Sequence, residues 1–366
     1  MVLSKYAHGI EPVNNTRNHC PHSCFIIPEY MNKNILKKGT AKQREQAWKN
    51  QILTEQLRGR RQITGSLYPL YAVSDRLFRS IYDSHNNENL PGTLIRTEGG
   101  TRNITNRNKA ATEAFDFSGA TYMYYYKANN RNSIDGRGMK LDSTVHYGED
   151  YNNAFWNGTQ MVYGDGDGVL FERFTSSLDV VGHELTHGVT QYEAALEYNG
   201  QSGALNESLS DVFGSLVKQY TLKQNVDEAD WLIGANLFTK KVKGVALRSM
   251  KEPGSAYDDP VIGKDPQPGH MKNFVKTTSD NGGVHINSGI PNRAFYLAAQ
   301  EIGGYAWEKA GKIWYVTLRD RLRENSDFQD AANLTFDVAC SLYGKRSREQ
   351  KAVNSGWKKV GIRTQI

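Results

Sequence analysis

This chain of 366 residues is poor in cysteine and has no long apolar run. Two of its three cysteines lie in the first 24 residues, so the rest of the chain cannot form an internal disulfide, and we expect Cys340 to be a buried core residue. A membrane-spanning helix needs about 20 apolar residues, and no such segment is present. Residues 1–15 lack the apolar core of a secretory signal. We therefore expect no membrane anchor, and either a cytoplasmic protein or one secreted without a standard signal peptide.

The net charge of +6 is unevenly distributed. Residues 1–65 hold eleven lysines and arginines against four acidic residues, whereas the remaining chain is nearly neutral. A nucleic-acid-binding domain carries its basic residues on the folded surface, so this distribution predicts no nucleic-acid partner. The chain also lacks the Gly-x-Ser-x-Gly elbow of one large group of serine hydrolases.

Residues 183–187 read His-Glu-Leu-Thr-His. On a helix, residues four positions apart lie on one face, so His183 and His187 would point the same way, with Glu184 beside them. This pattern supplies two of the three protein ligands of a catalytic zinc site together with a general base.

Glu207 is the candidate third ligand. It follows a Gly/Asn/Ser cluster at residues 199–203 that predicts a turn, and the turn would fold a second helix back onto the histidines. Asp211 lies one helical turn further, where a carboxylate can hold a ligand histidine through its other ring nitrogen. Taken alone, Glu207 and Asp211 would fit a solvated helix face better, but their spacing from the histidine pair favours the metal site.

A second histidine, His285, follows Asp280 across a Gly-Gly bend at residues 282–283. A neighbouring carboxylate raises the pKa of a histidine and fixes its orientation. A cationic His285 would stabilise the negative charge that develops on a carbonyl oxygen, and Tyr198 is a second candidate donor. Without the zinc motif, these two residues would be a loop histidine and a core tyrosine.

These motifs resemble the thermolysin family of zinc endopeptidases. The similarity keeps order and spacing from about residue 79 to the C-terminus, and the matching segments are residues 151–158, 161–168, 179–187, 206–211, 247–250 and 280–290. The short N-terminal leader and residues 79–83 are more similar to the protealysin-like subgroup than to thermolysin itself.

The resemblance implies a role for each metal-site residue. His183, His187 and Glu207 would bind Zn²⁺, and Asp211 would orient His183. Glu184 would be the general base that activates a zinc-bound water for attack on an internal peptide bond.

The resemblance also implies how the substrate is held. Tyr198 and His285 would stabilise the tetrahedral intermediate, with Asp280 orienting His285. Asn153 and the backbone of Ala154 would bind the substrate main chain.

On the C-terminal side of the cut bond, called the primed side, Arg248 would bind a substrate carbonyl. Five apolar residues would line the primed-side pocket: Phe171, Phe174, Val180, Ile233 and Leu247. They predict cleavage before hydrophobic or aromatic residues. Phe174 replaces a smaller aliphatic residue of thermolysin, so the resemblance does not predict the depth of the pocket.

The paired calcium site of thermolysin is predicted to be absent. Asp179 and Asp230 occupy acidic positions of that site, but Lys218, Leu232 and Ala235 replace the others. Calcium takes about six to eight oxygen ligands, and an ammonium group repels it. We expect Lys218 to pair with Asp179 or Asp230 instead.

Residues 1–70, called the leader, are interpreted as an inhibitory propeptide. The segment Phe25–Pro28 is a short apolar plug expected to lie in or near the substrate cleft, and residues 33–56 have a helical composition. Cleavage between residues 58 and 75 would release activity. The alternative is a disordered linker.

Cys20 and Cys24 lie close to two histidines in the leader, in the sequence His19-Cys20-Pro21-His22-Ser23-Cys24. A thiolate from this group would be able to cap the catalytic zinc. The alternative is an incidental cluster in an N-terminal arm.

The pattern predicts an α+β protein with two lobes around a cleft. Residues 71–192 would form a β-rich lobe that includes the zinc helix, and residues 193–366 a helical lobe. Alternating runs at 121–126 and 143–147 indicate strands, and Ser176 with Asp179 indicates the start of the zinc helix. Further helices are expected at 207–220, 290–301, 306–324 and 328–343.

Two other functions fit parts of this pattern. An aminopeptidase would need residues that bind a free amino terminus, and none can be identified. A binding protein on a protease fold would not need Glu184, Tyr198 and His285 together. We therefore expect a monomeric endopeptidase whose partners are protein substrates and its own leader.

Overall fold

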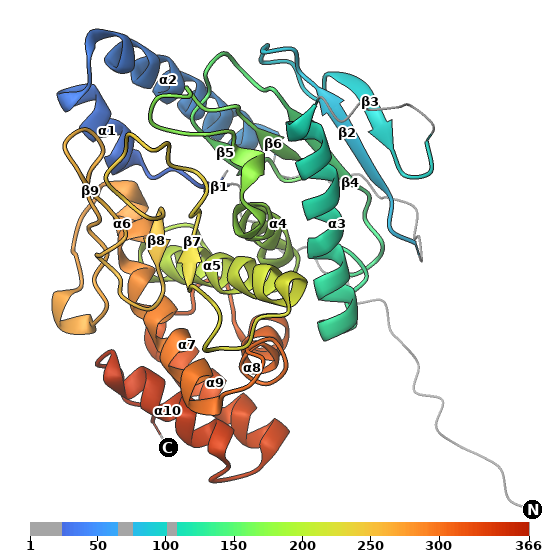
Figure 1. Cartoon of the computed structure of the whole chain (residues 1–366). Coiled ribbons are helices and arrows are strands. Elements are labelled where there is room, and N and C mark those ends of the chain that lie inside the picture. The colour runs from blue at the N-terminus through green and yellow to red at the C-terminus, as the bar shows by residue number, and fades with distance from the viewer. Residues whose placement is uncertain (1–23, 65–75, 101–107, 366) are drawn as a thin grey trace, which may run out of the picture.

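A six-stranded mixed sheet organises the N-terminal lobe of the computed structural model, which describes residues 24–64, 76–100 and 108–365 (Figure 1). The strand order is β1-β5-β6-β4-β2-β3, in which β4 pairs parallel with β2 and β6 and the other pairs are antiparallel. The strands are β1 (Cys24–Phe25), β2 (Arg79–Asp83), β3 (Thr93–Thr97), β4 (Leu141–Val145), β5 (Ala154–Trp156) and β6 (Met161–Tyr163).

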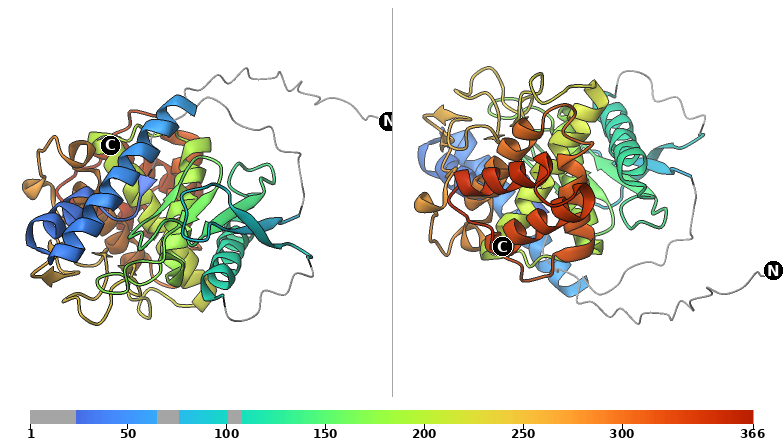
Figure 2. Two further views of the ribbon diagram at one scale, coloured as in Figure 1. Left: turned by 90° about the horizontal axis from the view of Figure 1, so that it is seen from above. Right: turned by 90° about the horizontal axis from the view of Figure 1, so that it is seen from below.

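The leader contributes strand β1 and two helices, α1 (Glu29–Lys38) and α2 (Ala41–Thr64). The helical prediction for residues 33–56 is confirmed, but the chain leaves the helical conformation at Gly39. Both helices lie along one side of the molecule (Figure 2), and they contact both lobes, since Gln46 donates to the Glu149 carbonyl and Asn34 to the Ile262 carbonyl. The expected leader boundary at residue 70 lies outside the described residues.

Helix α3 (Lys109–Asn129) corrects the prediction of a strand at residues 121–126. Asn108 caps the helix by accepting a hydrogen bond from the Ala111 N–H, and Asn130 ends it in the left-handed conformation at a φ of 53°. The tyrosines of this segment look like an alternating strand in a six-residue window. Over the whole helix, however, the buried residues recur at helical spacing and pack between the sheet and the C-terminal lobe.

Two long helices, α4 (Leu178–Tyr192) and α5 (Gly200–Leu222), cross the centre of the molecule. Helix α4 follows a 3₁₀ turn, η1 (Phe174–Ser176), and begins two residues later than predicted, with Ser177 at its N-cap. The turn predicted at 199–203 was placed too late, because α5 already starts at Gly200. The helices approach closely at Gly182 and Gly214: a Cβ atom at Gly214 would lie 2.4 Å from the Asp179 carbonyl oxygen.

The C-terminal lobe is helical, as predicted. Short strands follow α5 and form two two-stranded sheets: β7 (Leu232–Ile233), β8 (Arg248–Ser249), β9 (Asp258–Asp259) and β10 (Gly263–Lys264). The helices are η2 (Met271–Asn273), α6 (Asp280–Asn287), α7 (Gly289–Ile302), α8 (Ala310–Val316), the π-helical turn η3 (Thr317–Arg321), α9 (Phe328–Tyr343) and α10 (Arg348–Lys359).

The helix predicted at 306–324 is shorter, because residues 306–309 form a turn and the chain becomes extended at Leu322. Helix α10 was not predicted at all. None of the helices in the described part of the chain has the length and apolarity of a membrane-spanning segment.

Candidate active site

Three side chains from α4 and α5 meet in the buried centre of the molecule. The Nε2 atoms of His183 and His187 lie 3.0 Å apart. The Glu207 carboxylate faces both, with one oxygen 3.5 Å from His183 Nε2 and the other 3.4 Å from His187 Nε2. We call these three residues the ligand group.

Hydrogen bonds on the far side of each imidazole fix which ring nitrogen faces the centre. The Nδ1 atom of His183 lies 2.8 Å from Asp211 Oδ1, and the Nδ1 atom of His187 lies 2.8 Å from Asn206 Oδ1. Because these oxygens are acceptors, each Nδ1 carries the proton, and the two Nε2 lone pairs face each other. Burial lowers the pKa of His187 to about 3, which keeps its imidazole neutral.

This arrangement fits a tetrahedral zinc ion. A metal bound about 2.0–2.1 Å from each donor places neighbouring donors about 3.3 Å apart, close to the separations in the ligand group. One oxygen of Glu207, Oε2, is buried and accepts no hydrogen bond within the described residues. Two facing lone pairs and a buried carboxylate oxygen need a cation between them, and two histidines with one glutamate are a set that zinc accepts.

Asp211 is held by more than His183. Arg248 donates two hydrogen bonds of 2.8 Å to its two carboxylate oxygens, and Asn292 donates a third at 2.8 Å. Burial would raise the pKa of Asp211, but the positive charge of Arg248 and the bond to His183 hold it well below its usual range. The carboxylate is therefore ionised and fixes both His183 and Arg248.

Glu184 lies on the same face of α4 as the histidines. Its carboxylate oxygen lies within 4.8 Å of the imidazole nitrogens, and Oε2 accepts a 3.0 Å hydrogen bond from the Trp156 N–H at the end of β5. The side chain is fully buried. Glu184 is thus placed beside the ligand group, with its carboxylate oriented by the sheet.

Tyr198 and His285 face Glu207 from the C-terminal lobe. The hydroxyl of Tyr198 donates to Glu207 Oε1 and lies 3.3 Å from His285 Nε2. Asp280 binds His285 twice, at Nδ1 (2.6 Å) and at the backbone N–H (2.9 Å). Burial alone would lower the pKa of His285, but the carboxylates of Glu207 and Asp280 outweigh it and raise it to about 9.

The Gly-Gly bend predicted at residues 282–283 is confirmed. The chain has positive φ values from Asp280 to Gly283, between 49° and 82°, and this left-handed stretch turns His285 towards the ligand group. Glycine adopts such φ values without strain, which explains its place in the bend.

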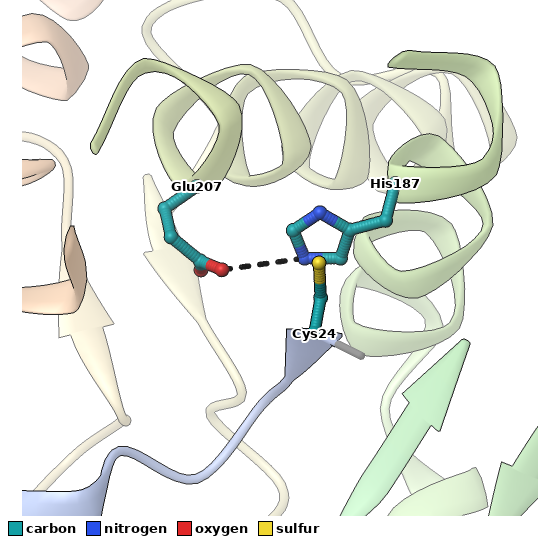
Figure 3. A group of neighbouring side chains, drawn as sticks. All are labelled: Cys24, His187 and Glu207. Atoms are coloured by element: carbon teal, nitrogen blue, oxygen red, sulfur yellow. Dashed lines mark ion pairs between the residues drawn. The ribbon is translucent and has the colours of Figure 1, made fainter. Parts of the chain in front are cut away.

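The leader runs directly through this site. Strand β1 pairs antiparallel with β5, so that Cys24 lies opposite Trp156 and Phe25 opposite Phe155. Figure 3 shows Cys24 reaching from the leader towards His187 and Glu207. The Cys24 sulfur, one imidazole nitrogen of His187 and one carboxylate oxygen of Glu207 lie within 4.8 Å of one another. Cys20 lies outside the described residues.

The five residues expected in the primed-side pocket are all buried. They belong to one apolar cluster with the leader residues Ile26 and Ile27: Phe171, Phe174, Val180, Ile233 and Leu247. The rings of Phe171 and Phe174 lie 6.0 Å apart. The structure therefore brings the pocket residues and the apolar plug of the leader into the same core.

Lys218 lies at the position of the paired calcium site, which the sequence predicted to be absent. Its ammonium group lies 2.7 Å from Asp179 Oδ2 and 2.9 Å from Asp230 Oδ1, and it donates to the Leu232 carbonyl at 2.8 Å. We call Lys218, Asp179 and Asp230 the lysine cluster. Lys218 pairs with both aspartates, whereas the sequence had suggested one or the other.

Sequence reasoning assigned no role to three polar residues of the site. Asn206 and Ser210 both contact Nδ1 of His187, at 2.8 and 3.0 Å, and Asn292 donates to Asp211. Asn206 and Ser210 could have been predicted from the sequence. They lie one helical turn apart and directly precede Glu207 and Asp211. Asn292 comes from another helix and had none.

Comparisons with known proteins agree with this geometry. The family model "Thermolysin metallopeptidase, catalytic domain" matches residues 49–191, and "Thermolysin metallopeptidase, alpha-helical domain" matches residues 194–362. An extracellular metalloprotease of Pectobacterium carotovorum subsp. carotovorum is 50% identical over 345 residues, covering 93% of this chain and 96% of its own length. Protease PrtS of Photorhabdus sp. (strain Az29) is 55% identical over 294 residues, which are 80% of this chain and 78% of that protein.

Among solved structures, the precursor of protealysin, a metalloproteinase from Serratia proteamaculans, has a TM-score of 0.83 and 49% identity, covering 93% of this chain and 99% of the other. The predicted fold, the protealysin-like character and the peptidase activity are thereby confirmed. The chain belongs to the thermolysin family of metallopeptidases and is a zinc-dependent endopeptidase made with a propeptide.

Proposed function

We propose that this endopeptidase cuts peptide bonds on the N-terminal side of hydrophobic residues, and that the leader keeps it silent by filling its cleft. The observation that supports this most strongly is the path of the leader backbone. It bonds with Ala154, Asn153, Arg248 and His285, four residues expected to hold a substrate. A leader bound by these groups excludes any other peptide.

His183, His187 and Glu207 would hold the zinc ion. When bound, zinc lowers the pKa of a water molecule and polarises a substrate carbonyl. Glu184 takes the proton of the attacking water and delivers it to the leaving amine, for which its fixed carboxylate beside the ligand group is suited. His285 and Tyr198 donate hydrogen bonds to the carbonyl oxygen as it becomes negative, and Asp280 keeps His285 cationic.

The preference for a hydrophobic residue after the cut bond follows from the pocket. Its five side chains carry no polar group that would satisfy a buried charge or hydroxyl, so a polar residue would be desolvated without compensation. Arg248 supports the same subsite, because it is anchored on Asp211 and its free end donates to the Ile26 carbonyl at 3.4 Å.

Cys24 adds a second means of inhibition. Its thiol is buried beside His187 and Glu207, where a thiolate would serve as a further zinc ligand in the position that water needs. We propose that the zymogen uses Cys24 in this way, and we assign no role to Cys20. The name of the Pectobacterium relative supports secretion of the enzyme.

The lysine cluster supports a protein without the paired calcium site. The ammonium group of Lys218 lies between two carboxylates that would otherwise be calcium ligands, and like charges exclude a second cation. Zinc is then the metal on which activity depends.

A peptide blocked at both ends, with an internal quenched fluorophore, tests the proposed activity on protein from which the leader has been removed. We expect cleavage before Leu, Ile or Phe, slower cleavage before Asp or Gly, and a rate at least about 10² lower in Glu184→Gln. An aminopeptidase or a binding protein would leave the blocked peptide intact, and either result would reject the proposal.

A further inference from the structure

The leader lies in the cleft as an additional strand of the sheet. The Ile26 N–H donates to the Ala154 carbonyl at 3.2 Å, and the Ile27 N–H donates to Asn153 Oδ1 at 3.0 Å. Addition of an extended peptide to a sheet edge fixes both the direction and the register of that peptide. Residues 25–27 therefore each face a defined part of the catalytic site.

The register places one peptide bond at the centre of the site. The carbonyl oxygen of Phe25 lies 3.0 Å from His285 Nε2, and that nitrogen is 3.3 Å from the Tyr198 hydroxyl. The next carbonyl, of Ile26, faces Arg248. Since His285 and Tyr198 are the proposed donors to the oxygen of the attacked carbonyl, the carbon of that bond is the Phe25 carbonyl carbon.

The residue that follows this bond also suits the pocket. Ile26 is fully buried and belongs to the main hydrophobic core, which also contains the primed-side residues. Phe25 packs on Phe155 of β5, with ring centroids 5.0 Å apart. The segment thus satisfies the proposed requirement for a hydrophobic residue after the cut bond.

We propose that the Phe25–Ile26 peptide bond is a latent cleavage site, bound as a substrate and protected only by the Cys24 thiol beside the ligand group. This inference rests on the proposed function. The thiol occupies the space beside His187 and Glu207 that an attacking water must enter. Its removal admits water to a bond that is already in place.

The reaction is a hydrolysis and needs no further reactant. The oxygen of water bonds to the Phe25 carbonyl carbon, the bond to the Ile26 nitrogen breaks, and Glu184 passes the proton of water to the Ile26 amine. The products are a fragment that ends at Phe25 with a carboxylate and a chain that begins at Ile26. The first cut therefore releases Cys24, whereas α1 and α2 stay joined to the chain that begins at Ile26 until a second bond is cut.

The test follows the full-length Cys24→Ala protein by mass spectrometry after zinc loading, beside wild type and Cys24→Ala/Glu184→Gln. We expect a new N-terminus at Ile26 as the first product of Cys24→Ala, at a rate independent of protein concentration. The wild type should be cut at this bond more slowly, because the Cys24 thiol is in place, and the double variant should stay intact, because it lacks the general base. Cys24→Ser serves in the same way if the alanine variant does not fold.

Cleavage of the blocked peptide distinguishes failure of the latent cleavage site from failure of the proposed endopeptidase function. If full-length Cys24→Ala keeps Phe25–Ile26 intact, or is cut first elsewhere, while protein from which the leader has been removed cuts the blocked peptide, the latent site is overturned and the proposed function stands. If the leader-free protein also leaves the blocked peptide intact, both are overturned.

Hydrogen exchange supplies a readout that does not depend on catalysis. In full-length Glu184→Gln, with or without zinc, the amides of Ile26 and Ile27 should be protected, because they donate to Ala154 and Asn153. Unprotected amides at both positions would remove the register from which the cleavage site was inferred.

Discussion

Helices α4 and α5 meet at two charged clusters that satisfy their buried carboxylates in different ways. In the lysine cluster, the ammonium group of Lys218 stands between Asp179 and Asp230. In the ligand group, the lone pairs of two imidazoles and the Glu207 carboxylate converge, while the Arg248 guanidinium is bound to Asp211. One cluster carries its cation within the chain, and the other requires a cation from outside.

The difference has a functional meaning. An internal ammonium group is permanent and has no open position, so the lysine cluster can only support the fold. A bound metal keeps a coordination position for water or for a thiol, and the ligand group can therefore be active or blocked. The same pair of helices thus combines a fixed structural charge with a replaceable catalytic one.

Removal of the metal should have the largest effect. We expect a chelator to abolish cleavage of the blocked peptide and added Zn²⁺ to restore it, whereas Ca²⁺ should not. Only the ligand group should lose a cation to the chelator. The unfolding temperature should therefore fall on chelation and recover with zinc, and it is measured on Glu184→Gln, which cannot digest itself. Full activity in protein shown by elemental analysis to lack metal would contradict the comparison.

Glu184→Gln should be the most damaging single substitution that keeps the metal. The amide cannot accept the proton of water, so turnover should fall by a factor of about 10² or more while zinc content stays at the wild-type level. Metal analysis and the blocked-peptide assay on the same sample measure both quantities. An equal loss of zinc and of turnover would instead give Glu184 a role in metal binding.

Lys218→Met tests the internal cation. Asp179 is 1% exposed, so loss of its partner leaves a buried charge unpaired and should lower the free energy of unfolding by about 3 kcal/mol. Chemical denaturation measures the change, and zinc affinity should remain unchanged. The control is Lys251→Met, at an exposed lysine, which should alter stability by less than about 0.5 kcal/mol. Similar stabilities of the two variants would argue against a structural role.

Asn206→Ala should have the smallest effect. It removes the acceptor that orients His187, and losses of such partners weaken zinc binding by about 10-fold or more. Competition with a chromophoric chelator measures the affinity, with Asn236→Ala at an exposed position as the matched control. An unchanged affinity would mean that Ser210 alone fixes the ring.

Much of this site could be predicted because its residues lie at helical spacing within short segments. His183, Glu184 and His187 fall within five residues, and Glu207 and Asp211 fall one turn apart. Some features that reach the site from distant parts of the chain carry no local pattern. Asn292 is one, and the register of the leader is another, because it depends on backbone hydrogen bonds to β5 that any sequence can form.

The errors in the fold have a similar origin. The segment 121–126 was interpreted as a strand from a short window. Its burial does not alternate: Tyr122, Tyr124 and Tyr125 are buried, whereas Met123 and Tyr126 are exposed. Helix α10 was missed because its polar sequence gives little apolar signal, and its burial comes from packing on α7 and α9. The lobe boundaries at residues 70 and 192 and the functional roles of the site residues stay predictions.

Mass spectrometry of the full-length wild type beside Glu184→Gln, both zinc-loaded and incubated alone at neutral pH, tests the central claim most directly. The claim is that this chain is a zinc endopeptidase blocked by its own leader. We expect loss of the leader in the wild type only, with Phe25–Ile26 among the bonds cut. Equal loss of the leader in both proteins, or a blocked peptide left uncut by wild-type protein from which the leader has been removed, would contradict it.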